Sequence, residues 1–357
     1  MNLNTVVPLC VILFAILSLP AVAQDETSWT DRLSFKGDLR LRYDGIDEEG
    51  EEERHRARYR ARLGLTAQAS SDVKVIAQFA SGADNPVSRN VTFDGGFNGD
   101  DIGFDLFYVD WAFADGWNLY GGKMRNPLFR AGGAPLVWDG DLNPEGIAVK
   151  FAERGLFGTI AAFFVEERSS SGDSLLFAAQ IGGKFELSDN FGLTAGFGYF
   201  GYSNTVGNEP FYNGSSRGNS VDIDGNYIND YKDVEVFAQL DTMVGDRPLS
   251  IYGQWVRNNE VDEEDTGYAI GADLGLGKTS LSWIYMDVEA DSVIGTFNDS
   301  DFGGGGADQS GHQLKVGYKL SSAVNVVGTF YVNDIDRFQG TEHDFKRVLL
   351  DVIFSFK

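Results

Sequence analysis

Arginine occupies every second position in the stretch ERHRARYRARL, residues 53–63. Guanidinium groups pair with carboxylates and bind anionic solutes, so their arrangement matters. Side chains on a β-strand point alternately to the two faces of the sheet, and a spacing of two therefore places all five arginines on one face. The segment before it adds two more at the same spacing. The sequence thus predicts an arginine ladder on two neighbouring strands: Arg40, Arg42, Arg54, Arg56, Arg58, Arg60 and Arg62.

The ladder belongs to a strongly acidic chain, with 53 Asp and Glu against 29 Lys and Arg and a formal net charge of -24. Such a chain repels phosphates, which excludes nucleic acid as a partner. An apolar run over residues 6–19 followed by Ala21-Val22-Ala23 predicts a secretory signal peptide over 1–23. The one cysteine, Cys10, lies in this run, so the exported chain would have no disulfide and no thiol chemistry.

Sixteen segments with period-two alternation follow, and none shows the period of an amphipathic helix. Short turns between them alternate with long loops rich in Asp, Glu, Gly and Asn, such as 204–230 and 291–310. The predicted strands are 33–43, 53–68, 73–81, 102–114, 117–124, 145–152, 156–167, 174–187, 191–203, 231–242, 248–258, 267–278, 279–289, 311–320, 323–333 and 345–356.

Short turns at one end and long loops at the other are typical of an outer-membrane barrel. A soluble β-sandwich gives the same alternation but does not explain the asymmetry of the turns, and only a closed barrel leaves no unpaired edge in lipid. We therefore predict an all-β fold, a transmembrane antiparallel β-barrel of about 16 strands over residues 33–357. Its turns would be periplasmic and its long loops extracellular, after a short periplasmic segment over 24–32. The outer membrane of a Gram-negative bacterium would supply lipid and lipopolysaccharide as partners.

Inside such a barrel the ladder must face the lumen, because an arginine on the lipid face costs about 2–4 kcal/mol near the midplane. Barrels of 16–18 strands leave an aqueous channel, whereas those of about eight are filled by side chains. The ladder would then attract and orient the anionic parts of small hydrophilic solutes. Alternatively, opposing carboxylates neutralise the arginines in a packed lumen, and the ladder serves structure alone.

Residues 123–149, KMRNPLFRAGGAPLVWDGDLNPEGIAV, resemble Gram-negative outer-membrane porins, chiefly the family called "putative porin" and more distantly the phosphate-selective porins. The similarity rests on Trp138-Asp139 and on the phrase from Asp141 to Gly146. It implies that the third long loop, about 125–144, folds into the barrel and narrows it. The acidic residues that would face the ladder across this constriction are Asp139, Asp141 and Glu145. The sequence has no lysine-rich cluster that would indicate phosphate specificity.

Passive diffusion of small hydrophilic solutes or ions is the predicted function, with no catalysis and no cofactor. The three histidines are far apart in the sequence, and no hydrolase or phosphate-loop motif is present. The alternative is a surface-structural or adhesive barrel with a closed lumen, although no loop is long enough to fold as a separate domain. Many sixteen-stranded porins are trimers, so the resemblance implies a homotrimer. The choice between anions and cations stays open.

Residues 222–233, DIDGNYINDYKD, carry oxygen ligands around a glycine turn and give a weak indication of bound Ca²⁺. The candidate ligands are Asp222, Asp224 and Asp230. Their spacing is not that of an EF-hand, and most loops of this composition are simply solvated.

Overall fold

The computed structural model describes residues 29–357 except 83, 170 and 339. The predicted signal peptide, 1–23, lies outside the described residues, as do residues 24–28 of the predicted periplasmic segment. The described chain begins with a single 3₁₀ turn, η1 (Trp29–Arg32). No helix among the described residues is long and apolar enough to cross a membrane.

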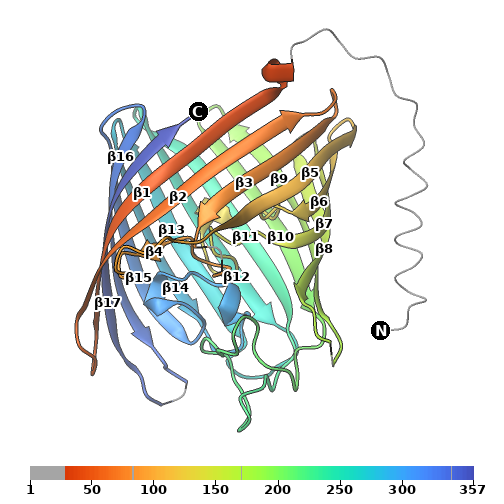
Figure 1. Cartoon of the computed structure of the whole chain (residues 1–357). Helices are drawn as coiled ribbons and strands as arrows, with labels where there is room; N and C mark the ends of the chain where they lie inside the picture. The colour runs from red at the N-terminus through yellow and green to blue at the C-terminus, as the bar shows by residue number, and fades with distance from the viewer. Residues whose placement is uncertain (1–28, 83, 170, 339) are drawn as a thin grey trace.

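Sixteen strands of the described chain close into one antiparallel barrel, as the sequence predicts (Figure 1). Each strand pairs with its neighbours in sequence, and β1 pairs with β17 to complete the ring. The barrel strands are β1 (Leu33–Glu48), β2 (Arg54–Gln68), β3 (Val73–Ser81), β5 (Ile102–Ala114), β6 (Trp117–Lys123), β7 (Glu145–Glu153), β8 (Leu156–Glu166), β9 (Ser174–Ser188), β10 (Phe191–Tyr202), β11 (Lys232–Val244), β12 (Arg247–Asn258), β13 (Thr266–Leu276), β14 (Thr279–Val288), β15 (Gln309–Lys319), β16 (Val324–Ile335) and β17 (His343–Phe356).

One further short strand, β4 (Val91–Thr92), was not expected from the sequence. It pairs with Arg58 and Tyr59 of β2, beyond the point where the shorter β3 ends. A two-residue strand is too short to show period-two alternation, so no pattern in the sequence indicates it. It marks the place where the 82–101 loop returns to the barrel wall.

The two ends of the barrel differ as predicted. Connections of two to four residues join the strands at the end where the C-terminus lies, and the long loops lie at the other end (Figure 1). At the turn between β7 and β8, Arg154 and Gly155 both have positive φ, 49° and 83°. A two-residue hairpin turn of this kind matches the right-handed twist of the paired strands.

Apolar side chains cover the outside of the barrel, as a lipid-facing surface requires. On β17, Leu350 and Phe354 are 50% and 42% exposed, whereas the alternate residues Arg347, Leu349 and Asp351 are all at most 4% exposed. The same alternation on β1 turns the arginines inward. The position of Arg40 and Arg42 on the luminal cavity agrees with the inward face expected for the ladder.

Long loops fill much of the lumen. The 124–144 loop, which contains the 3₁₀ turn η2 (Ala131–Gly133), donates the amide of Gly132 to the side chain of Gln239, 2.8 Å away. A Cβ on Gly132, whose φ is 59°, would lie 2.1 Å from the ring of Tyr252 on β12, so only glycine permits this approach. The loop thus crosses the lumen and contacts the wall formed by β11 and β12.

A second loop, 289–308, also lies inside the barrel, with the 3₁₀ turns η3 (Gly295–Phe297) and η4 (Phe302–Gly304). Val293, Ile294 and Phe302 are almost completely buried. Asn219 of the 203–231 loop holds it by donating to the carbonyls of residues 290 and 293 and accepting the amide of residue 295. This loop folds into the lumen instead of extending outward, because its apolar residues pack against the loops beside it.

Candidate functional site

The register of β1 and β2 sets the arginine ladder. Arg40 lies opposite Arg60 and Arg42 opposite Arg58, whereas Asp38 lies opposite Arg62. Like charges directly opposite each other destabilise a sheet, so the ladder needs carboxylates close by. The structure supplies them from the strands themselves and from the inserted loops.

Asp44 neutralises the extracellular half of the ladder. Its carboxylate is fully buried and accepts hydrogen bonds from Arg56 at 2.6 Å, Arg58 at 3.3 Å and Arg347 at 2.9 Å. Arg347 belongs to β17, so this cluster joins the last strand to the first two. A buried carboxylate with three guanidinium partners fixes all three side chains in place.

Two further carboxylates pair with three more arginines of the wall. Asp38 accepts Arg60 at 3.0 Å and Arg62 at 2.8 Å. Asp351 of β17 accepts two hydrogen bonds from Arg42, at 2.7 and 2.9 Å. The ladder is therefore a network of ion pairs that spans β17, β1 and β2.

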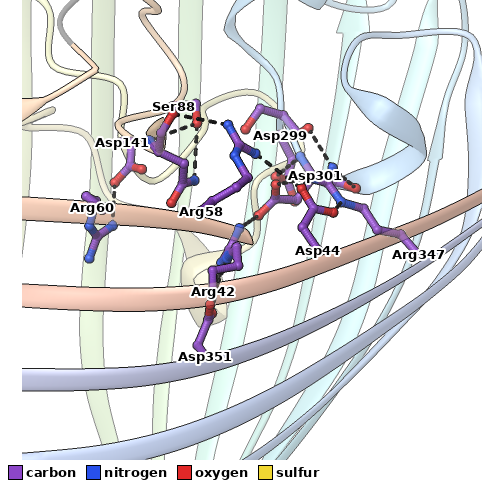
Figure 2. A network of polar contacts seen from close by, with 12 residues as sticks. Arg42, Asp44, Arg58, Arg60, Ser88, Asp141, Asp299, Asp301, Arg347 and Asp351 are labelled. Carbon is purple, nitrogen blue, oxygen red and sulfur yellow. Dashed lines mark hydrogen bonds and ion pairs between the residues drawn. The ribbon is translucent and has the colours of Figure 1, made fainter. Parts of the chain in front are cut away.

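Each of the three inserted loops binds this network (Figure 2). Asn90 of the 82–101 loop accepts Arg40 on its side chain at 2.5 Å and Arg58 on its backbone carbonyl at 3.1 Å. Asp141 of the 124–144 loop lies 3.3 Å from Arg60 and 3.6 Å from Arg62.

Asp301 attaches the third loop, 289–308, at 2.8 Å from Arg42 and 3.1 Å from Arg347. Burial opposes the ionisation of Asp301, but the charges of Arg347 and Arg42 outweigh it and hold the pKa below its usual range. The ladder thus serves as the docking surface for three loops that are far apart in the sequence.

Asp139 does not contact the ladder. Its side chain accepts the backbone amide of Ser300 at 3.0 Å, and its own amide donates to the carbonyl of Phe297 at 2.8 Å, so it joins two inserted loops. Burial and the nearby charges of Asp299 and Asp141 raise the pKa of Asp139 well above its usual range. Burial, followed by the charge of Asp301, raises the pKa of Asp299 to about 6. Asp139 therefore links the 124–144 loop to the 289–308 loop and does not face the ladder arginines.

The assignment of Glu145 to the constriction is wrong. Its side chain is 61% exposed and pairs with Lys123 of β6 at 2.7 Å. Glu145 is the first residue of β7 and lies on the same face as Ile147 and Val149, whereas the buried Ala148 lies on the other. Once the strand begins at Glu145, alternation turns this carboxylate to the outside of the barrel.

The remaining ladder residues differ in exposure. The side chains of Arg42, Arg58 and Arg62 are 5%, 13% and 25% exposed, so ion pairs cover most of the ladder. Arg54 is exposed at the extracellular end of β2. The sequence predicted acidic residues facing the ladder across a gap, whereas Asp141 is in direct contact with it. The alternative of neutralised arginines describes these contacts better.

The carboxylates proposed for Ca²⁺ do not converge. Asp222 accepts the amides of Asp224 and Asn226 within a tight turn, and Asp230 accepts the hydroxyl of Thr205. No group of three His, Cys, Asp or Glu residues in the described chain could hold a metal ion. Asp222 thus satisfies backbone amides of its own turn, as Asp commonly does.

Sequence reasoning missed Asp44, Arg347, Asp351, Asn90 and Asp301. The two β17 residues could have been found, because a closed barrel makes the first and last strands neighbours and their spacing turns them inward. The apolar residues of the 289–308 loop were the other available signal, because a run of apolar side chains in a loop indicates that the loop is buried.

Comparisons with known proteins agree on one architecture. A family model described as "Putative porin" matches residues 47–229 and 218–356. The chain is similar to Pseudomonas putida OprB, with 13% identity, 92% of this chain and 95% of that chain covered and a TM-score of 0.63. It is also similar to Salmonella typhi OmpF, with 12% identity, 92% and 99% covered and a TM-score of 0.58. Acinetobacter baumannii OccAB4 gives 10% identity, 91% and 98% covered and a TM-score of 0.52. No curated protein matches the sequence.

Proposed function

We propose that this chain, a member of the putative porin family in the Gram-negative outer membrane, lets small hydrophilic solutes and ions diffuse along a narrow path beside its arginine ladder. The ladder and the loops docked on it would set the width and the charge of that path. The proposal includes no catalytic step and no cofactor.

One observation carries this proposal: a polar cavity of about 500 Å³ lies inside the barrel between the ladder, the inserted loops and the strands opposite. Charged and amide side chains line it, among them Arg40, Arg60, Asp141 and Gln313. A polar lining favours water and small hydrophilic solutes over apolar ones.

The ladder would act mainly by holding the loops. Its guanidinium groups are fixed by carboxylates at hydrogen-bonding distance, so the width of the path would depend on Asp141 and Asp301 staying in place. Buried ion pairs of this kind resist separation, because removing one partner leaves an uncompensated charge. Solutes would then be sorted by size first and by charge second.

Single-channel recording of the refolded mature protein in a planar bilayer tests the proposal. We expect stable conductance steps in KCl, and a reversal potential under a KCl gradient that gives the preferred ion. A change in electrophoretic mobility when the sample is heated establishes that the barrel was folded. Silence from a folded barrel would contradict the proposal.

A closed structural barrel is the second candidate, and the packing of the extracellular half favours it. The loops bury a cluster of aromatic residues inside the barrel, including Phe211, Tyr227 and Tyr231, each at most 2% exposed. Silent bilayers with a folded protein would support this reading.

The proposal also includes partners. The apolar outer face, with Leu350 and Phe354 exposed, suits outer-membrane lipid and the acyl chains of lipopolysaccharide. We propose a homotrimer, and crosslinking in intact outer membranes followed by mass measurement tests it.

A further inference from the structure

Three carboxylates form a row on the luminal wall opposite the ladder: Glu186 of β9, Asp241 of β11 and Asp273 of β13. The strand register places them at one level. Gly192 of β10 pairs with both Glu186 and Asp241, and Ser250 of β12 pairs with both Asp241 and Asp273. At a strand spacing of about 4.8 Å, the two ends of the row are about 19 Å apart. Because Gly or Ser lies between each two carboxylates, no long side chain covers them.

The three carboxylates have no cationic partner. Within the described chain, no Lys or Arg nitrogen lies within 4.0 Å of any of them. Asp241 accepts hydrogen bonds from neutral donors, the amide of Gln239 at 2.9 Å and the hydroxyl of Ser250. The row therefore presents uncompensated negative charge to the lumen, in contrast to the ladder, where ion pairs cover most of the arginines.

Cavities follow the row from the periplasmic end inward. One of about 710 Å³ is lined by Glu186, Gly192 and Asp241, among others, and a smaller one of about 170 Å³ by Ser250 and Asp273. These two cavities share Ser250 in their linings, and the smaller one shares Asp273 with the luminal cavity beside the ladder. The three cavities therefore adjoin, and the carboxylates lie along them from the periplasmic mouth to the luminal cavity.

The lining of this route is acidic. Three acidic residues line the cavity at the periplasmic end and one lines the smaller cavity, and neither lining includes a basic residue of the described chain. The luminal cavity itself has six carboxylates against five basic side chains. A cleft lined by one sign of charge raises the local concentration of ions of the opposite sign.

We infer that the channel prefers cations to anions, and that Glu186, Asp241 and Asp273 determine this preference. Asp and Glu side chains that line a pore select cations. Neighbouring carboxylates of the row come from strands about 10 Å apart, so a small cation that leaves the luminal cavity stays close to one of them along the route. The inference rests on the proposed function, because a preference among ions requires a conducting channel.

The reversal potential under a KCl gradient tests the inference. We expect the wild-type channel to prefer K⁺. Each of the variants Glu186→Gln, Asp241→Asn and Asp273→Asn should lower the permeability ratio of K⁺ to Cl⁻ about twofold, as the loss of one unit charge several ångströms from the ion predicts. Glu153→Gln is the matched control, because it removes a carboxylate from the periplasmic end of β7 that lies on the outer face and is 59% exposed. This control should leave the ratio unchanged.

Gly192→Lys adds the opposite charge to the row, between Glu186 and Asp241. A Cβ at this glycine would have no atom within 4 Å, so the lumen has room for the side chain. We expect the permeability ratio to fall further than in any of the neutral variants. A Cl⁻ preference of the wild type, or a ratio that none of the four variants lowers, would overturn the inference while the conductance still supports a channel. Absence of any conductance from a folded barrel would refute the proposed function and the inference with it.

Discussion

Replacing Asp301 by Asn tests whether the ladder holds the 289–308 loop inside the barrel. Asn keeps the size of the side chain but removes the charge that binds Arg42 and Arg347, 2.8 and 3.1 Å away. A hydrogen bond to a charged group contributes about 1.5–3 kcal/mol, and removing one partner of a buried ion pair costs about 3–5 kcal/mol. The side chain of Asp301 is 18% exposed, and both arginines keep other carboxylates, Asp351 and Asp44. We therefore expect the free energy that favours the loop seated inside the barrel to fall by about 2 kcal/mol.

That loss changes the ratio of seated to unseated loop about 30-fold. In single-channel recordings the Asp301→Asn variant should show brief excursions to higher conductance that are rare in the wild type. Asp344→Asn is the control, because Asp344 pairs with Lys346 at 3.1 Å on the surface with both side chains at least half exposed. A surface pair of this kind contributes about 0–1 kcal/mol. Records of Asp301→Asn that match those of the control would show that the loop is held by its packing and not by the ladder.

Three other predictions concern the inserted loops and the strand that follows one of them. Asp141→Asn removes a carboxylate from two ladder arginines and should shift the reversal potential toward anion preference; an unchanged sign and size would contradict the assigned contact. Glu145→Gln alters a residue on the outer surface and should change neither conductance nor selectivity in the same recordings. The raised pKa values of Asp139 and Asp299 mean that the contribution of these protonated side chains to loop attachment is complete below about pH 4. For Asp299 it is lost as the pH rises through about 6, so open-channel noise should be greater at about pH 7.5 than at about pH 5.

The strands could be predicted because the lipid imposes a strict rule on them. Every residue of a barrel strand faces either lipid or lumen, so alternation persists along the whole strand and fixes its face as well as its existence. The sequence ended the first strand at residue 43, whereas β1 continues to Glu48. Residues 44–48 pair with β17, but Ile46 is the one large apolar residue among them, so alternation of hydrophobicity no longer marks a strand there.

The site could be predicted only in part, because its contacts join segments that the sequence does not place together. The inward face of the ladder and the involvement of Asp141 followed from alternation and from the resemblance. The contact of Asp301 with Arg42 depends on the path of a loop that folds back into the lumen over 259 positions of sequence separation. No local pattern encodes that path. The prediction for Glu145 failed for a local reason. A shift of one residue in the alternation along β7 decides whether this side chain faces the lumen or the outside.

The seam between β1 and β17 has a consequence for how the barrel assembles. Arg42 and Asp351 are 309 positions apart, and Asp44 and Arg347 are 303 apart, yet these pairs lie side by side in the finished protein. Contacts of such separation form late, because the chain must first lose the entropy of closing a very long loop. Until the last strand arrives, Arg42 lacks Asp351 and Asp44 lacks Arg347, so an open intermediate leaves these two ion pairs unformed at its edge. Ring closure therefore converts an open edge of the intermediate into a part of the wall that is cross-linked by buried ion pairs, and we expect this step to limit the rate of folding.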